Sequence, residues 1–208
     1  MIKLVVFDLW NTLCYKPESV TRKLEKAFNI DMPHKEFVKL FESIVQTSVW
    51  ETEYDGYSEL LRALGINCTK YNIMKTVAII GKTEEQIAVY DFTVQLLRQL
   101  KKKKIKIGLI TNSSVFVRDV LKNKTKLLEL IDYPIFSYEL GTIKPDPVLF
   151  LEMQRLAGVT NPSEIIMIGD NLYDDIYPAL KLGMNAIQFT GDYSKLKKEL
   201  KKFGVNVR

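Results

Sequence analysis

Leu4-Val5-Val6-Phe7-Asp8 decides the fold, because a short apolar run that ends on a carboxylate is typical of a strand buried in a parallel sheet. We predict this strand at residues 2–8. Similar runs follow at residues 105–111, 133–137, 165–169 and 185–189. Helical patterns lie between them, at residues 91–103, 147–157 and 175–182. This alternation predicts an α/β fold with a doubly wound, Rossmann-like parallel sheet.

Residues 15–87 interrupt the alternation. They form successive amphipathic patterns, which predict helices near residues 17–29, 34–50, 54–64 and 69–80. Pro33, Gly56, Gly65 and Gly81 fall at or near the helix ends. We therefore predict two units: a core made of residues 1–14 and 88–208, and a helical insertion over residues 15–87.

The composition is that of an ordinary globular protein. The 208 residues are 47% hydrophobic and 26% charged, and no apolar run approaches the ~18 residues that span a bilayer. Cys14 and Cys68 form no disulfide framework, which indicates reduced thiols and a cytoplasmic location. The composition leaves the choice between monomer and homodimer open.

The net charge of +5 would attract an anionic substrate. The lysine runs at residues 101–104 and 195–202 supply much of the excess, but no aromatic or glycine spacing typical of nucleic-acid binding accompanies them. We interpret them as solvated helix faces. The expected partner is a small anion, with neither nucleic acid nor a membrane involved.

Polar side chains follow the predicted strands, where an open parallel sheet binds its ligands. Carboxylates with neighbouring oxygen donors suit a hard cation such as Mg²⁺, and a further carboxylate could act as a nucleophile. In chain order, the residues that follow the strands are Asp8, Trp10, Asn11 and Thr12, then Thr111, Asn112 and Ser113, then Lys144, and finally Asp170, Asn171, Asp174 and Asp175.

Four motifs in this order resemble those of the haloacid dehalogenase-like (HAD) hydrolase superfamily. They are Phe-Asp-Leu-Trp-Asn-Thr-Leu at 7–13, Ile-Thr-Asn-Ser-Ser at 110–114, Gly-Thr-Ile-Lys-Pro-Asp-Pro at 141–147 and Ile-Gly-Asp-Asn-Leu-Tyr-Asp-Asp-Ile at 168–176. The resemblance covers essentially the whole chain. It implies that the helical insertion is a small cap that closes over the site.

The resemblance also implies catalytic roles. Asp8 would be the nucleophile, and Thr111 would hydrogen-bond the transferring group with Asn112 beside it. Lys144 would neutralise the nucleophile and the developing negative charge. Asn112 and Trp10 would contact the substrate.

The same resemblance implies a Mg²⁺ site. Asp8, Asp170 and the backbone carbonyl of Trp10 would hold the ion. Asp175 would support the metal shell or orient the lysine, and Asp174 is the less favoured substitute.

Trp10 departs from the phosphatase pattern. Phosphatases that the chain resembles carry an aspartate at this position, which protonates the leaving oxygen and then activates water. Indole has no group that titrates for this purpose. An aromatic residue at this position resembles the metal-independent 2-haloacid dehalogenases, whereas Asp170 and Asp175 keep the acidic end of a phosphatase. The dehalogenases also carry a cap arginine, and neither Arg22 nor Arg62 sits in a matching motif.

Three functions remain open at this level. The favoured one is a Mg²⁺-dependent phosphatase of small organic phosphates. The alternatives are a metal-independent 2-haloacid dehalogenase and a catalytically weak module that binds an anion or a partner. Trp50, Tyr54, Tyr57 and Lys82 are candidates for facing the cleft, although ordinary packing or surface positions are the better expectation for them. The single histidine, His34, is expected at the surface.

Overall fold

A five-stranded parallel sheet forms the centre of the computed structural model, which describes residues 1–207. The strands lie in the order β5-β4-β1-β6-β7, with β1 in the middle. This arrangement confirms the predicted α/β class. The bounds are β1 (Leu4–Phe7), β4 (Lys106–Thr111), β5 (Tyr133–Phe136), β6 (Ile165–Gly169) and β7 (Asn185–Gln188).

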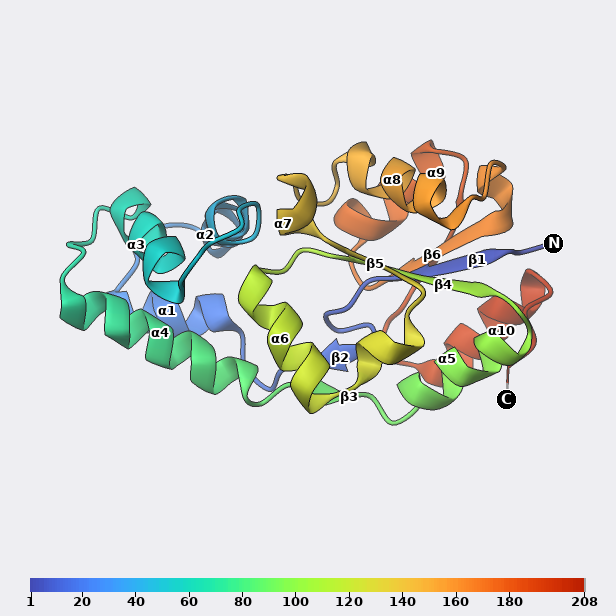
Figure 1. The fold of residues 1–208 in the computed structure, drawn as a ribbon, viewed down its shortest axis with the longest axis horizontal. Helices are drawn as coiled ribbons and strands as arrows, with labels where there is room; N and C mark the ends of the chain where they lie inside the picture. Colours follow the sequence, from blue (N-terminus) through green and yellow to red (C-terminus); the bar gives the residue numbers. More distant parts are fainter. Residues whose placement is uncertain (208) are drawn as a thin grey trace.

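Helices cover both faces of the sheet (Figure 1). On one face lie α5 (Thr93–Lys102), α6 (Val115–Lys124) and α10 (Tyr193–Lys202). On the other lie α8 (Pro147–Ala157) and α9 (Tyr177–Lys181). Shorter segments connect them: a 3₁₀ turn at Leu127–Leu130, α7 (Ser137–Leu140) and a 3₁₀ turn at Pro162–Glu164.

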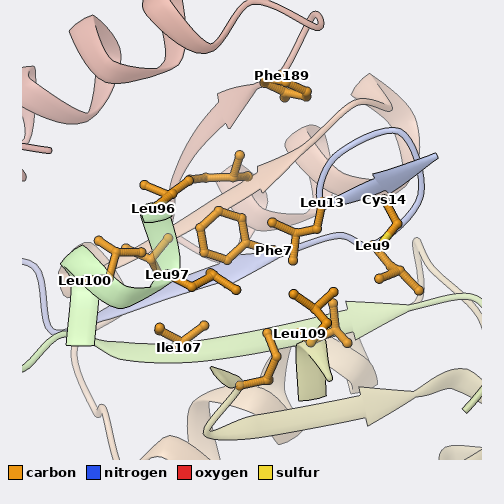
Figure 2. Packing of buried hydrophobic residues seen from close by; sticks show 14 of the residues in the cluster. Phe7, Leu9, Leu13, Cys14, Leu96, Leu97, Leu100, Ile107, Leu109 and Phe189 are labelled. Carbon is orange, nitrogen blue, oxygen red and sulfur yellow. The ribbon is translucent and has the colours of Figure 1, made fainter. Parts of the chain in front are cut away.

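The apolar strands hold these layers together. Figure 2 shows Leu96, Leu97 and Leu100 of α5 packed beside Phe7 of β1 and Ile107 of β4, and all five side chains are fully buried. Burying each of these side chains contributes roughly 1.5–3 kcal/mol relative to exposing it. The sheet is therefore a rigid platform for the residues that follow its strands.

Two local features differ from the sequence-based expectation. The helix predicted at residues 175–182 is a π-helical turn at Leu172–Ile176 that leads into α9. The turn starts early because the Asn171 side chain accepts hydrogen bonds from the backbone N–H groups of Tyr173 and Asp174. Helix α6 was not predicted.

Four helices gather at one end of the molecule (Figure 1). They are α1 (Val20–Phe28), α2 (His34–Val45), α3 (Glu53–Ala63) and α4 (Lys70–Glu84). They share an apolar core that includes Leu24, Phe37, Tyr57 and Ile80. Helix α2 ends five residues before the predicted position 50, and a capping box at Thr52 and Asp55 starts α3.

A two-stranded antiparallel ribbon brackets these helices. It pairs β2 (Cys14–Tyr15) with β3 (Ala88–Val89). We propose that the cap begins and ends at this ribbon, close to the predicted boundaries.

The exposure of one lysine run agrees with the sequence analysis. Lys101 to Lys104 are exposed at the end of α5, as expected for a solvated helix face. Within residues 1–207, no helix is both long and apolar enough to cross a membrane.

Candidate active site

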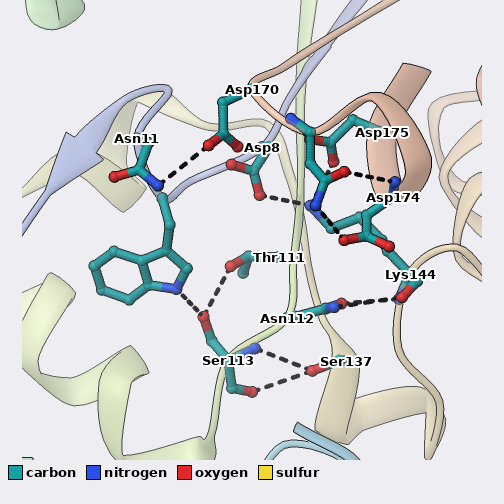
Figure 3. A network of polar contacts seen from close by, with 12 residues as sticks. Asp8, Asn11, Thr111, Asn112, Ser113, Ser137, Lys144, Asp170, Asp174 and Asp175 are labelled. Carbon is teal, nitrogen blue, oxygen red and sulfur yellow. Dashed lines mark hydrogen bonds and ion pairs between the residues drawn. The ribbon is translucent and has the colours of Figure 1, made fainter. Parts of the chain in front are cut away.

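The carboxyl ends of three adjacent strands bring the predicted site residues together (Figure 3). Asp8 follows the central strand β1, Thr111 ends β4, and Asp170 follows β6. Because β1 pairs with both β4 and β6, these side chains meet at one edge of the sheet. Lys144 reaches the same place from the loop before α8.

Lys144 bridges two buried carboxylates. Its Nζ lies 2.5 Å from Asp8 Oδ1 and 2.6 Å from Asp175 Oδ1, and all three side chains are buried. Burial lowers the pKa of Lys144, but the two carboxylates together raise it by more, so the ammonium group stays charged. Burial raises the pKa of Asp8, while the lysine opposes that shift. The arrangement holds the Asp8 carboxylate in place and leaves the trio with a net negative charge.

Gly169 permits Asp175 to lie this close to the sheet. A Cβ added at Gly169 would lie 2.2 Å from Asp175 Oδ2, well inside van der Waals contact. The same Oδ2 accepts a hydrogen bond of 3.1 Å from the backbone N–H of Asn171. The Gly-Asp-Asn sequence thus fixes Asp175, and through it Lys144.

We expect Gly169→Ala to destabilise the protein by ~1–3 kcal/mol, because overpacking at a buried site displaces its neighbours. Activity should fall as well, because Asp175 could no longer hold Lys144. Gly81→Ala is the matched control: a Cβ there meets nothing within 4 Å, and alanine in a helix should stabilise by up to ~1 kcal/mol. Urea unfolding of both variants measures the difference. A Gly169→Ala variant as stable as wild type would contradict this assignment.

The cluster of Asp8, Asp170 and Asp175 fits a hard divalent cation. Asp8, Asp170 and Asp175 each offer a carboxylate oxygen, and these atoms lie within 4.8 Å of one another. Asp8 Oδ2 is buried and has no hydrogen-bond partner among the described residues. Both Asp175 oxygens are already bonded, to Lys144 and Asn171, so Asp8 and Asp170 are the better metal ligands.

Asn11 and Asp174 lie next to this acidic cluster. Asn11 donates a hydrogen bond of 3.1 Å to Asp170 Oδ2 from a left-handed backbone position (φ 55°), which asparagine tolerates well. Asp174 lies one residue before Asp175 and accepts a hydrogen bond of 2.5 Å from the Asn171 side chain. It is absent from the cluster of Asp8, Asp170 and Asp175, and its lower rank as a metal ligand stays a prediction.

Trp10 is tied to the loop after β4. Its indole N–H donates to Ser113 Oγ at 3.0 Å, and Ser113 Oγ lies 2.8 Å from Thr111 Oγ1. Lys16 Nζ lies 3.9 Å from the centre of a Trp10 ring, which adds a cation–π contact. The single N–H of Trp10 is therefore engaged, and the side chain offers no proton that titrates.

Asn112 is hydrogen-bonded to the loop that carries Lys144. Its Oδ1 accepts a hydrogen bond of 2.8 Å from the Lys144 backbone N–H. A contact with substrate remains a prediction for both Asn112 and Trp10, and both side chains line the cavity described next.

A cavity of about 260 Å³ lies beside these residues, between the core and the helical segment. We call it the leaving-group cavity; it is lined by Trp10, Asn11 and Asn112 on one side and by Glu42, Gln46 and Tyr57 on the other. Of the four residues considered from the sequence as candidates for facing the cleft, Tyr57 lines this cavity. Trp50 packs against Gly56, where an added Cβ would lie 2.9 Å from the indole, and Tyr54 and Lys82 are exposed.

Sequence reasoning missed Lys16, Glu42 and Glu84, which also line this cavity. Each is a charged residue in or beside an amphipathic helix, and a sequence gives no signal that separates it from surface lysines and glutamates. His34 is half-buried, and its Nδ1 lies 2.6 Å from Glu25 Oε1, away from the strand ends.

Comparison with known proteins places the chain among hydrolases. A family model described as haloacid dehalogenase-like hydrolase matches residues 2–183. The chain is 27% identical over 214 residues to a glyceraldehyde 3-phosphate phosphatase of Pyrococcus furiosus, covering 97% of this chain and 87% of that one. It is 35% identical over 116 residues to the rhythmically expressed gene 2 protein of Drosophila melanogaster, covering 54% of this chain and 43% of that protein.

Solved structures share the fold. A HAD family enzyme of Bacteroides thetaiotaomicron, in complex with magnesium and inorganic phosphate, matches with a TM-score of 0.68 and 19% identity, covering 94% of this chain and 99% of that one. A 2-haloacid dehalogenase of Pseudomonas syringae matches with a TM-score of 0.64 and 23% identity, covering 98% and 100%. The fold is thus common to both branches, and the choice between them depends on the site residues.

Proposed function

Because the chain belongs to the haloacid dehalogenase-like hydrolases, we propose that it is a Mg²⁺-dependent phosphatase of small organic phosphates, with Asp8 as nucleophile. The observation that carries this proposal is the unpartnered, buried Asp8 Oδ2 beside Asp170. A metal-independent enzyme has no use for a second, half-buried carboxylate next to its nucleophile. The sequence similarity to a glyceraldehyde 3-phosphate phosphatase supports the same choice.

In the proposed reaction, Asp8 attacks the phosphorus atom, an aspartyl phosphate forms, and the bond to the leaving oxygen breaks. Lys144 holds the carboxylate and offsets negative charge, and Thr111 donates a hydrogen bond to the phosphoryl group. Mg²⁺, held by Asp8, Asp170 and the Trp10 carbonyl, would supply further positive charge at the transferring group. Water then cleaves the aspartyl phosphate and restores Asp8.

The proposed substrate is a small anion in a cytoplasmic setting. The net charge of +5 attracts anions, and the leaving-group cavity of about 260 Å³ limits the size of the organic part. Both cysteines are free, which suits a reducing compartment.

A 2-haloacid dehalogenase is the second candidate, and Trp10 is the observation that favours it. Halide leaves without a proton, so a site with no acid at position 10 could still release it. This reaction would need neither Asp170 nor a metal ion.

We expect phosphatase activity with Mg²⁺ and none in EDTA, because the ion balances charge among three clustered carboxylates. Mg²⁺ should also raise the melting temperature, and Asp170→Ala should lose both effects. Asp31→Ala is the control, since Asp31 is exposed and lies outside the cluster.

A panel of phosphorylated metabolites, p-nitrophenyl phosphate and 2-chloropropionate, each tested with Mg²⁺ and with EDTA, measures the activity. Hydrolysis of 2-chloropropionate in EDTA would replace the phosphatase proposal by the dehalogenase. An unchanged Mg²⁺ shift in Asp170→Ala would place the ion elsewhere.

A further inference from the structure

The proposed phosphatase reaction leaves one proton unassigned. An alkoxide leaving group needs a proton as it departs, and the residue at position 10 cannot supply it. The Trp10 N–H is already donated to Ser113, and indole does not titrate in the relevant range. An acid on the wall of the leaving-group cavity would provide this proton during hydrolysis of alkyl phosphates.

Helix α2 presents one acid to that cavity. Val38, Glu42 and Val45 are spaced four and three residues apart, so they share a helix face, and all three line the cavity. Glu42 also lines a second cavity, bounded by Lys144, Asn171 and Asp174, and therefore sits where the two meet beside the strand ends.

Asn112 connects Glu42 to the site. Asn112 and Glu42 both line the leaving-group cavity, where Asn112 opposes the rise of the Glu42 pKa, and the Asn112 side chain accepts a hydrogen bond of 2.8 Å from the Lys144 backbone N–H. Asn112 directly follows Thr111, which we place at the phosphoryl group. Glu42 therefore faces the same cavity as the residue that follows Thr111.

We propose that Glu42 donates the proton to the leaving oxygen and then accepts a proton from the attacking water. This inference rests on the proposed phosphatase function. In the first step the Asp8–phosphorus bond forms, the phosphorus–oxygen bond of the substrate breaks, and the leaving oxygen takes the Glu42 proton. In the second, water oxygen bonds to phosphorus, its proton goes to Glu42, and the Asp8–phosphorus bond breaks.

The surroundings of Glu42 suit both steps. Burial, and then the negative charge of Asp174, raise the pKa of Glu42 to about 7, against the opposing effects of Lys144 and Asn112. A group with such a pKa can both donate and accept a proton near neutral pH. The charged groups around it are Asp174 and Lys144 of the core, Lys39 of the same helix, and Lys16, Glu18 and Glu84 along the leaving-group cavity.

Glu84 is the competing acid on this cavity. It is 6% exposed, and burial raises its pKa to about 7 as well. Its charged neighbours, however, are Lys16 and Glu53 rather than the residues at the strand ends. Glu84→Gln is therefore a matched control, with the same chemical change on the same cavity.

The test compares kcat/KM for glycerol phosphate, an alkyl ester, with that for p-nitrophenyl phosphate, whose leaving group needs no proton. Glu42→Gln should lower the alkyl rate by ~10²–10⁴-fold and the aryl rate far less, because general acid catalysis has this magnitude. The wild-type alkyl rate should fall as pH rises through about 7, since Glu42 then loses its proton. Glu42→Gln should lack this alkaline limb, and Glu84→Gln should keep both the limb and the alkyl-to-aryl ratio.

Glu42→Asp covers the case in which the glutamine variant does not fold. It retains a carboxyl group and should retain the alkaline limb. Three results would overturn the inference. The first is a Glu42→Gln variant with the alkyl-to-aryl ratio and the pH profile of wild type. The others are loss of the alkaline limb in Glu42→Asp and a selective loss of alkyl phosphate hydrolysis in Glu84→Gln. Absence of hydrolysis of either ester by wild type would instead reject the proposed function.

Discussion

Asp8→Asn lowers hydrolysis of every substrate by at least ~10³-fold, because the amide has the shape of the carboxylate but is a poor nucleophile. The fold should persist, since Lys144 keeps Asp175 as its partner at 2.6 Å. Steady-state kinetics with Mg²⁺ and circular dichroism measure the two effects.

Asp146→Asn is the matched control for this variant. Asp146 caps α8 by accepting a hydrogen bond of 2.9 Å from the Val148 N–H, and asparagine caps a helix equally well. Its activity should stay within a few-fold of wild type. An Asp8→Asn variant with more than about a tenth of wild-type activity would contradict covalent catalysis by Asp8.

Lys144→Met is expected to have the largest effect on stability, about 3–5 kcal/mol, because it leaves two buried carboxylates without their cation. Lys3→Met is the control. The Lys3 side chain is 61% exposed in its ion pair with Glu164, and such pairs contribute at most ~1 kcal/mol. Equal losses of unfolding free energy in the two variants would contradict the proposed role of the buried trio.

The loss in Lys144→Met should also depend on pH. Burial already raises the pKa of Asp8, and removal of the ammonium group raises it further. A carboxyl group whose pKa is raised in the folded state contributes stability at low pH and loses it as pH rises through the folded value. Urea unfolding in EDTA should therefore find the variant closer to wild type at about pH 5 than at about pH 8.

The sheet could be predicted from the sequence because its three central strands are buried on both faces. Residues 4–7 and 165–169 are apolar throughout or end on glycine, and similar short runs mark the other strands. The ribbon of β2 and β3 escaped prediction because two residues per strand carry no periodicity. The turn at 172–176 escaped because it depends on backbone capping by the Asn171 side chain.

The site residues likewise fall into those that the sequence predicts and those that it does not. Asp8, Thr111, Lys144, Asp170 and Asp175 could be located because they follow strands of one parallel sheet. Glu42 could not be located, because it lines the same cavity as Asn112 only in the folded protein, and the two residues are seventy positions apart in the chain. The bond between Trp10 and Ser113 likewise joins residues 103 positions apart and leaves no local pattern.

The central claim is that Asp8 carries the phosphoryl group during turnover. The direct measurement is mass spectrometry of the Asp8 peptide after acid quench of the enzyme turning over acetyl phosphate. We expect a phosphoryl adduct on Asp8 that requires Mg²⁺ and is absent in Asp8→Asn. The adduct should accumulate further in Glu42→Gln, whose water attack lacks a base. Sustained turnover with no adduct on Asp8 in either protein, or an adduct on another residue, would contradict the account.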